Sequence, residues 1–332
     1  MLIVEQIIRM INRLVDFNLK SDNYQILFYG STSTAECRFC KKIVIKLESY
    51  NEKCYILKGY FGVAISVVLE RQLLFSELLR EKNINTPHHY ILDSSFQYVV
   101  NADEQNIIVT LEDFIPGKLV DLTKDTINMY TLLMAETHVV SEVSSFQIGR
   151  QAKWYNYSQK NEVIRFDKFL KMRDIDHLSK HKDLFDKIVR KTEIITSMIN
   201  EMICQLPQVA VHGDFSQSNI IKDEKNQQYY IIDFDQASDC NLISDFVLQS
   251  SLWIETIEVQ NNYSFFKMAD HLLKTYGSVR HINRIEVKLA MLMYKMARAF
   301  YYKRVKLIES NTIRTIAEYR EILEQMDDSL TI

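Results

Sequence analysis

The segment 209–237 carries the residues of this chain that are best suited to do chemistry. His212, Asp214 and Asn219 follow the spacing His-x-Asp-x4-Asn, and Asp233 comes after the apolar pair Ile-Ile. Carboxylate and amide oxygens are hard ligands that can hold Mg²⁺ while leaving room for phosphate oxygens and water. Two acidic residues and an amide at these spacings are what a Mg²⁺-dependent phosphoryl-transfer site requires.

Two apolar runs predict the element that would position the metal ligands. Residues 219–222 and 229–233 flank the polar stretch Asp-Glu-Lys-Asn-Gln-Gln, which is typical of a β-hairpin centred near residues 225–226. In an antiparallel pair with that centre, position 219 lies opposite position 232 or 233. We therefore expect Asn219 and Asp233 side by side at the open end of the hairpin.

Asp214 lies on the loop before this hairpin. The apolar strand Val209–Val211 gives way to the loop at Gly213. A carboxylate there can accept or orient the proton of a hydroxyl group. Each polar residue alone would suit an ordinary turn, since Asp and Asn favour turns. The complete set, with a strand before it and a hairpin through it, favours a functional site.

The run His212-Gly-Asp-Phe-Ser-Gln-Ser-Asn219, followed by Ile-Ile-Asp233, resembles the catalytic segment of the aminoglycoside phosphotransferase and choline kinase group. These are small-molecule kinases. The resemblance implies an α+β, two-lobed, protein-kinase-like fold with a small N-terminal β-sheet lobe and a larger, mainly helical C-terminal lobe. The lobes implied are a nucleotide-binding lobe at 1–113, a hinge at 114–117, and a catalytic and substrate-binding lobe at 118–332.

Residues upstream extend the resemblance to an ATP site. Lys58 ends the apolar strand 54–58 and resembles the family lysine that holds the α- and β-phosphates of ATP. Residues 66–82 have the apolar spacing of a helix, which would supply the carboxylate partner of that lysine. Glu70 has leucines three, four and eight positions later, so we expect it to be that partner. Glu77 is the alternative, in a more solvated setting.

Two further segments are expected to contact the nucleotide. An apolar strand stopped by Pro-Gly is similar to the family hinge, where Asp113 would offer its carbonyl and Ile115 its N–H to adenine. The chain has no G-x-G-x-x-G motif to cover the phosphates. The nearest candidate is the turn 30–34, in which Ser31 and Thr32 would cradle phosphate. A Ser/Thr-rich turn without a ligand is the alternative.

Other residues near the motif have supporting roles by the same resemblance. His212 would brace the catalytic loop, and His138, on a helix, would support it without taking part in the chemistry. Asp245 would buttress the segment. Asp235 would either join the metal shell or cap the turn.

Composition excludes several other classes of protein. The net charge of −3 with 25% charged residues provides no basic patch for nucleic acid, and no apolar run reaches 18 residues. Residues 1–17 form an amphipathic pattern interrupted by charges, which predicts a helix on the small lobe rather than a signal peptide or membrane anchor. The five cysteines lack a disulfide framework. We expect a cytoplasmic monomer or homodimer whose cysteines are reduced thiols. The alternative is that Cys37-x-x-Cys40 forms a metal-binding or redox pair.

These observations predict an ATP:Mg²⁺-dependent O-phosphotransferase acting on a hydroxyl of a small molecule. Asp214 would position the hydroxyl and take its proton, while Asn219 and Asp233 would bind Mg²⁺. Lys58, paired with Glu70, would hold the phosphates that are not transferred. A non-catalytic, kinase-like nucleotide-binding protein is one alternative, and a protein kinase is another, although no A-P-E segment is present.

The acceptor stays open between an amine-bearing antibiotic, as in a resistance kinase, and a metabolite of the homoserine or choline type. Carboxylates and aromatic residues follow the hairpin and would suit a cationic acceptor. The same residues would also suit a solvated helix face. They are Asp239, Trp253, Glu255, Glu258 and Tyr263.

Overall fold

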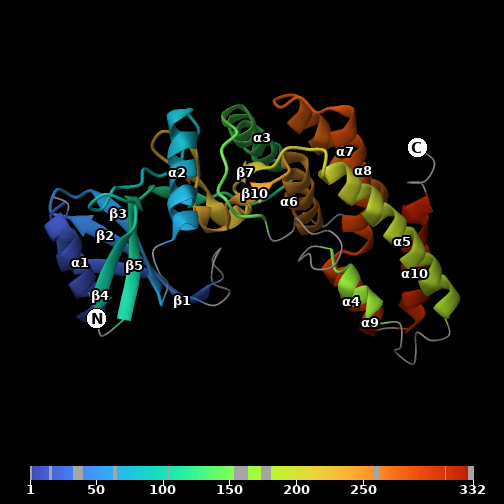
Figure 1. Cartoon of the computed structure of the whole chain (residues 1–332), viewed down its shortest axis with the longest axis horizontal. Helices are drawn as coiled ribbons and strands as arrows, with labels where there is room; N and C mark the ends of the chain where they lie inside the picture. Colours follow the sequence, from blue (N-terminus) through green and yellow to red (C-terminus); the bar gives the residue numbers. More distant parts are fainter. Residues whose placement is uncertain are drawn as a thin grey trace. The chain divides into compact units, whose positions relative to one another are not determined.

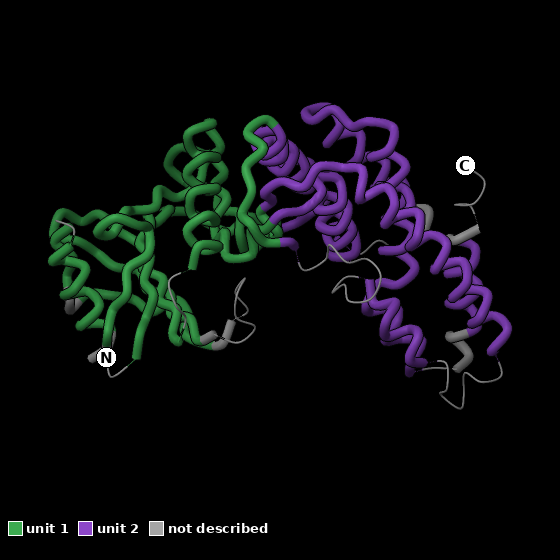
Figure 2. Tube along the Cα trace, in the orientation of Figure 1, with its two compact units in different colours: residues 1–121, 143–150, 212–238 green, residues 122–142, 151–211, 239–332 purple. Residues whose placement is uncertain are grey.

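The computed structural model describes nine stretches of the chain, namely residues 2–14, 17–32, 40–62, 66–102, 105–152, 164–172, 181–257, 262–310 and 312–327. The chain divides into two compact units, each assembled from separate segments (Figure 2). Unit 1 comprises residues 1–121, 143–150 and 212–238, and unit 2 comprises residues 122–142, 151–211 and 239–332. Residues 212–237 of the predicted motif segment therefore lie in the same unit as the N-terminal sheet, whereas residues 209–211 belong to unit 2. The predicted lobe limits at 113 and 118 stay a prediction.

Unit 1 contains an antiparallel five-stranded sheet with the order β1-β2-β3-β5-β4 (Figure 1). Its strands are β1 (Leu19–Thr32), β2 (Cys40–Ser49), β3 (Cys54–Phe61), β4 (Tyr98–Ala102) and β5 (Gln105–Asp113). Side chains alternate between the two faces of a strand. In β2 the residues Ile43, Ile45 and Leu47 belong to the buried core, whereas Lys42 and Val44 line a pocket on the other face.

Helix α1 (Leu2–Leu14) covers the core face of this sheet. Its apolar positions recur at helical spacing, and Ile7, Ile8 and Ile11 are fully buried in the same cluster as the β2 residues. The amphipathic N-terminal pattern thus forms a helix on the small sheet, as expected. The α1 side of the sheet is closed by this core, which leaves the opposite side for a ligand.

Helix α2 (Val67–Glu81) matches the helix expected over 66–82. The Ser66 side chain accepts the Leu69 N–H and caps the first turn, as serine commonly does. The helix ends at Glu81 with Lys82 as its C-cap, and Asn83 follows with a φ of 64° before the Thr-Pro pair. The end of α2 therefore falls where the proline predicts it.

A second small sheet in unit 1 holds the predicted hairpin. It has the order β6-β8-β9, with strands β6 (Gly117–Leu119), β8 (Ile220–Asp223) and β9 (Tyr229–Ile231). Ile221 pairs with Tyr230, so the turn is centred between residues 225 and 226, and the predicted register is confirmed. Strand β6 was not expected from the sequence. A Cβ on Gly117 would meet the Lys222 carbonyl, so this pairing requires glycine there.

Unit 2 is mainly helical. Its helices are α3 (Ile127–Ser144, except its last two residues), α4 (Phe166–Leu170), α5 (Lys182–Ile203), α6 (Leu242–Thr256), α7 (Asn262–Gly277), α8 (Arg284–Ala299), α9 (Tyr302–Ser310) and α10 (Thr312–Asp327). Strand β7 (Val209–Val211) pairs with β10 (Ser238–Cys240). The chain breaks between α8 and α9, where Phe300 and Tyr301 are buried.

Among the described residues, no helix is long and apolar enough to cross a membrane. The antiparallel N-terminal sheet and the mostly helical C-terminal part confirm the predicted α+β class.

Candidate active site

The open end of the hairpin brings Asn219 and Asp233 together as predicted. The Ile232 N–H donates to the Asn219 carbonyl at 2.9 Å, which places residue 219 directly opposite residue 232. Asp233 follows with a φ of 60°, in the left-handed region that aspartate tolerates better than most residues. This backbone turn ends the strand and turns the chain into the short helix η3 (Phe234–Gln236).

Asp214 and Asn219 are joined by direct hydrogen bonds. Asn219 Nδ2 donates to the Asp214 carbonyl at 2.9 Å and to Asp214 Oδ2 at 3.0 Å. The amide nitrogen is therefore committed to Asp214, and Asn219 Oδ1 is the atom that can face a cation. Asn219 is buried and Asp214 is half-buried, so the pair is rigid but open to a ligand.

His212 braces the loop, as the sequence predicts. Its Nε2 lies 3.0 Å from the Ile232 carbonyl, and its Nδ1 lies 3.3 Å from the Asp214 backbone nitrogen. Since the Asp214 N–H can only donate, Nδ1 must accept and Nε2 must carry the proton. The neutral imidazole thus links the Asp214 loop to the strand that precedes Asp233. This side chain is engaged at both nitrogens and holds the loop in position.

Gly213 is required between these two residues. Its φ is 77°, and a Cβ there would meet the Gln236 carbonyl oxygen. A residue other than glycine would be strained by its backbone conformation and would also displace η3. The approach of these two backbone segments therefore explains the glycine of the His-Gly-Asp motif.

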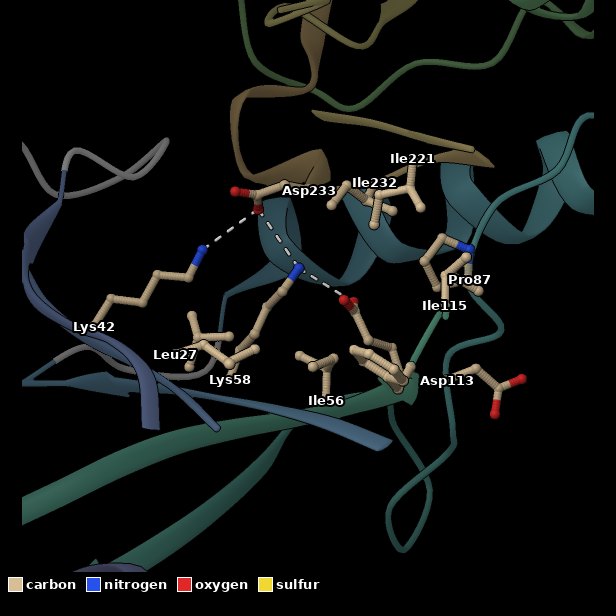
Figure 3. A pocket seen from close by; sticks show the side chains of 13 residues that line it. Leu27, Lys42, Ile56, Lys58, Pro87, Asp113, Ile115, Ile221, Ile232 and Asp233 are labelled. Carbon is tan, nitrogen blue, oxygen red and sulfur yellow. Dashed lines mark hydrogen bonds and ion pairs between the residues drawn. The ribbon is translucent and has the colours of Figure 1, made fainter. Parts of the chain in front are cut away.

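Lys58 on β3 points toward Asp233 (Figure 3). Its Nζ lies 3.5 Å from Asp233 Oδ1 and 3.1 Å from Glu112 Oε2. Burial disfavours the ammonium, but Glu112 and Asp233 outweigh it and hold the Lys58 pKa above its usual value. Burial likewise disfavours the Asp233 carboxylate, yet Lys58 and Lys42 keep the pKa of Asp233 below its usual range. Lys58 and Asp233 are therefore both charged at neutral pH.

The predicted pairing of Lys58 with Glu70 is wrong in this structure. Glu70 accepts hydrogen bonds from Ser95 Oγ at 2.7 Å and from the Phe96 N–H at 3.2 Å. The carboxylate that pairs with Lys58 is Glu112 on β5. Register explains the difference, because β3 pairs with β5, and the side chain of Glu112 lies on the same face as that of Lys58. Helix periodicity cannot reveal such a cross-strand neighbour.

The alternative partner, Glu77, is also engaged elsewhere. It accepts from the His89 N–H at 2.6 Å and from Arg80 Nη2 at 2.6 Å, so it anchors the segment after α2. Glu77 is buried, contrary to the solvated setting expected from the sequence. The solvated setting was expected because Arg80 and Glu81 follow in the sequence. In the structure the Arg80 side chain forms an ion pair with Glu77 itself.

A second buried lysine, which sequence reasoning missed, enters the site from β2. Lys42 Nζ lies 2.7 Å from Asp235 Oδ2 and 3.4 Å from Asp233 Oδ1. Tyr60 completes the group by donating its hydroxyl to Asp235 Oδ1 at 2.9 Å. Asp235 is therefore fully engaged by the sheet. The sequence predicted that Asp235 would either join the metal shell or cap the turn. In the structure its carboxylate instead binds Lys42 and Tyr60.

Helix α2 also contributes to the site through Gln72. The buried Gln72 amide donates to the carbonyls of Asp235 at 3.1 Å and Ala237 at 2.8 Å. These bonds satisfy two backbone acceptors just after the left-handed turn at Asp233. The helix predicted to supply a carboxylate to the lysine thus holds the segment after Asp233 in place.

The pocket next to these residues has a volume of about 180 Å³. Its walls are apolar, with Leu27, Val44 and Ile56 from the sheet and Ile221 and Ile232 from the hairpin. In Figure 3 Lys42, Lys58 and Asp233 lie at one end, whereas Pro87 and Ile115 lie at the other. The pocket is thus an apolar slot that leads to a charged cluster.

The predicted hinge residues Asp113 and Ile115 both line this pocket. The Asp113 carboxylate accepts from Tyr90 Oη at 2.7 Å and pairs with Lys53 Nζ at 3.0 Å, so it faces away from the lysine cluster. A role of Asp113 in ligand binding must therefore rest on its backbone, as predicted. Contact of either residue with adenine stays a prediction.

The predicted phosphate-covering turn is only partly visible. The backbones of Ser31 and Thr32 belong to β1 and pair with Lys41 and Cys40 of β2. Their side chains lie outside the described residues, and so do Ser33 and Thr34. The same holds for Cys37 and for the side chain of Cys40, so the predicted cysteine pair is not described either.

His138 and Asp245 form a buried pair within unit 2. His138 Nε2 lies 3.3 Å from Asp245 Oδ2, and His138 Nδ1 lies 2.8 Å from Tyr276 Oη. Burial lowers the pKa of His138 below its usual value. These contacts give both residues partners in the helical core, and the support of the Asp214 segment expected from them stays a prediction.

The residues expected to attract a cationic acceptor are mostly occupied. Trp253 is buried and packs on Tyr130 with 5.7 Å between ring centroids. Glu255 forms an ion pair with Arg298, and Asp239 is buried. Helix α6 is thus part of the core rather than a solvated or acceptor-binding face. Glu258 and the side chain of Tyr263 lie outside the described residues.

The donor set of the hairpin suits Mg²⁺ bound together with a phosphate ligand. Within the described stretches, no three His, Cys, Asp or Glu side chains gather into a metal cage. Asn219 and Asp233 provide one amide oxygen and one carboxylate instead. Mg²⁺ commonly takes one or two protein ligands and completes its shell with water and substrate phosphates. The residues present therefore fit a metal that arrives with a nucleotide.

Solved structures share this fold across nearly the whole chain. An aminopropanol kinase associated with a microcompartment has a TM-score of 0.59 at 13% identity, covering 97% of this chain and 95% of that chain. An amicoumacin kinase in complex with AMP-PNP, Ca²⁺ and Ami has a TM-score of 0.56 at 13% identity, covering 98% and 93%. An aminoglycoside phosphotransferase from Alicyclobacillus acidocaldarius has a TM-score of 0.56 at 11% identity, covering 97% and 94%.

The chain therefore has the kinase-like fold that small-molecule phosphotransferases use, and the predicted two-part architecture is confirmed. The RIO domain family, which is kinase-like, matches residues 163–245, the stretch that holds the His-Gly-Asp motif and Asp233. No curated protein matches the sequence.

Proposed function

We propose that this protein is an ATP:Mg²⁺-dependent O-phosphotransferase that phosphorylates a hydroxyl of a small molecule. One observation carries the proposal, namely the apolar slot of unit 1 that ends at Lys58 and Asp233. A purine base needs flat apolar walls, and a polyphosphate needs cations and a metal site at one end of them. Both requirements meet in one pocket of one compact unit.

Different residues of the pocket would bind the base, the phosphates and the metal ion of the nucleotide. Leu27, Val44 and Ile221 would enclose the base, and the backbones of Asp113 and Ile115 would pair with its edge. Lys58, held by Glu112, would contact the phosphates that are not transferred. Asn219 and Asp233 would hold Mg²⁺, which when bound neutralises charge on the phosphate oxygens.

Asp214 is assigned to the acceptor. Its Oδ2 accepts from Asn219, so we assign Oδ1 to the acceptor hydroxyl. Oδ1 would take the hydroxyl proton as the oxygen attacks the γ-phosphorus, while the bond from that phosphorus to the β,γ-bridging oxygen breaks and ADP leaves. Phosphoryl transfer has a loose transition state, and most of the catalysis comes from positioning and charge neutralisation. The hydrogen bonds of His212 and Asn219 to the Asp214 loop supply this positioning.

The acceptor is proposed only as a class. The compared structures are an aminopropanol kinase, an amicoumacin kinase and an aminoglycoside phosphotransferase. Amine-bearing antibiotics therefore head the acceptors to be tested, followed by amino alcohols and metabolites of the homoserine or choline type. Fold alone does not choose among them.

An ATP-consumption screen tests the proposal directly. Purified protein with Mg²⁺ and ATP is offered aminoglycosides, other amine-bearing antibiotics, choline, ethanolamine, homoserine and sugars. We expect consumption that depends on one acceptor class and is lost in Asp214→Asn, which serves as the matched control. Tight binding of ATP without turnover on any acceptor would support instead the alternative of a non-catalytic nucleotide-binding protein.

A further inference from the structure

Lys42 is a buried cation that has no role in the proposed kinase mechanism. Its side chain is 7% exposed, and its Nζ lies 2.7 Å from Asp235 and 3.4 Å from Asp233. Its neighbour Lys41 is exposed, because successive residues of a strand face opposite ways. Lys42 lines the same pocket as Lys58 (Figure 3).

Anchoring Asp235 does not by itself account for a buried ammonium. Taking an ammonium group out of water costs several kcal/mol unless other groups compensate for it. Tyr60 already donates to Asp235 Oδ1, so a neutral donor would have been enough for the second oxygen. Lys42 instead approaches Asp233 Oδ1 at 3.4 Å, and Lys58 approaches the same atom at 3.5 Å. Two like charges are thus brought onto one carboxylate oxygen.

The charged side chains around this pocket suit a polyanion that binds together with a divalent metal ion. Three carboxylates, Glu112, Asp233 and Asp235, face two ammonium groups, Lys42 and Lys58. A divalent cation on Asp233 would leave an excess of positive charge among these groups. Phosphate oxygens are the ligands that would neutralise it.

We propose that Lys42 is a second phosphate-binding lysine, held in position by Asp235 and aimed with Lys58 at the nucleotide phosphates. The inference rests on the proposed function and adds a residue to the same site. The chain has no G-x-G-x-x-G motif, which in other kinases supplies backbone donors to the phosphates. Lys42 lies near the start of β2, where it can supply a donor from the sheet itself.

Calorimetric titration of the full chain tests this assignment. Wild type, Lys42→Met and Lys41→Met are each titrated with Mg·ATP and with adenosine. We expect Lys42→Met to weaken Mg·ATP binding by about 10- to 100-fold, the range of a hydrogen bond to a charged group, and to change adenosine binding less than about twofold. Lys41→Met, on the opposite face of the same strand, should match wild type for both ligands.

A double-variant cycle with Asp235→Asn separates phosphate binding from support of Asp235. If Lys42 binds phosphate, Lys42→Met still weakens Mg·ATP binding at least about tenfold in the Asp235→Asn background. If Lys42 only neutralises Asp235, its effect disappears there, and the proposal is overturned. Equal losses for adenosine and Mg·ATP would overturn it as well.

The binding readout also separates this proposal from the proposed function. Mg·ATP binding that is unchanged in Lys42→Met overturns the Lys42 assignment alone. A wild-type protein that does not bind Mg·ATP overturns both. Binding by the wild type without turnover, combined with a selective loss in Lys42→Met, supports the Lys42 assignment even when no acceptor is found.

Discussion

At the scale of single residues, Asp214 and Asp233 have different hydrogen-bond and ion-pair partners. Asp214 is linked to Asn219 through the amide nitrogen and is separate from the two lysines, which converge on Asp233. Substitutions at Asp214 and Asp233 should therefore have different consequences. One should affect turnover, and the other should affect metal-dependent binding.

Asp214→Asn keeps the size of the side chain and removes the carboxylate charge. We expect turnover to fall by a factor on the order of 10²–10⁴, as for loss of a general base. The affinity for Mg·ATP should stay within a few fold, because the lysines and Asp233 are untouched. Steady-state kinetics with the acceptor found in the screen, together with calorimetry, measure both quantities. Turnover close to wild type would remove Asp214 from the mechanism.

Asp233→Ala should abolish the gain in ATP affinity that Mg²⁺ provides. Asp233 is the carboxylate that the hairpin places beside Asn219, and an alanine leaves only the amide oxygen as a ligand. Calorimetric titration of ATP with and without Mg²⁺ compares the two conditions in each protein. The metal assignment fails if the variant shows an undiminished gain.

Glu112→Gln should weaken Mg·ATP binding roughly tenfold, because Lys58 loses its charged partner and is no longer held in position. Glu70→Gln is the matched control, since Glu70 contacts Ser95 and Gln97 rather than the lysine. We expect the control to bind Mg·ATP like wild type. A larger effect at Glu70 than at Glu112 would restore Glu70 as the lysine partner.

At the scale of elements, the site depends on the close approach of a loop and a short helix. The His212 imidazole connects the Asp214 loop to the end of the hairpin, and Gln72 connects α2 to the segment after Asp233. Gly213 allows the loop to approach Gln236. The positions of Asp214 and Asp233 are thus set by contacts to the backbone between these elements.

Gly213→Ala tests this approach, with Gly149→Ala as control. Both glycines have positive φ, 77° and 86°, but a Cβ on Gly149 meets no atom within 4 Å. The control should lose about 1 kcal/mol of unfolding free energy from backbone strain alone. Gly213→Ala should lose more and should also lower turnover. Denaturant unfolding measures the first quantity, and equal losses in the two variants would contradict the steric argument.

At the scale of the whole molecule, stability should depend on pH through buried histidines. Burial, followed by the charge of Lys58, lowers the pKa of His89 to about 3. His89 is therefore neutral in the folded protein, whereas the unfolded chain takes up its proton below about pH 6.5. The unfolded state binds more protons across this interval, so the free energy of unfolding decreases as pH falls from about 6.5 toward 3. His138 changes stability in the same direction.

His89→Leu should flatten this pH dependence by up to about 1.4 kcal/mol per pH unit, the contribution of one proton. Urea unfolding between about pH 7 and 5.5 measures the slope above the titration range of most carboxylates. The exposed His281 provides the control variant, His281→Gln, whose slope should match wild type. An unchanged slope in His89→Leu would show that this histidine is not the buried neutral group.

Local pattern in the sequence predicted the hairpin, the helices α1 and α2 and the motif, but not strand β6. Alternation and turn residues predicted the hairpin, and its register puts Asn219 opposite Ile232 as expected. Helical spacing predicted α2 and its limits, and the amphipathic repeat predicted α1. These features depend on residues close together in the chain, so their physical signals are local.

The partners of the charged groups were decided only by the tertiary structure. Lys42 and Asp233 are 191 residues apart, and Lys58 finds Glu112 because β3 lies beside β5 in the sheet. From the sequence alone, a charged residue on a strand is expected to lie at a solvent-exposed strand end or on an edge strand. Which strands become neighbours depends on the packing of the whole sheet, and no local period encodes it. The carboxylate predicted on the α2 helix was therefore replaced by one from a strand.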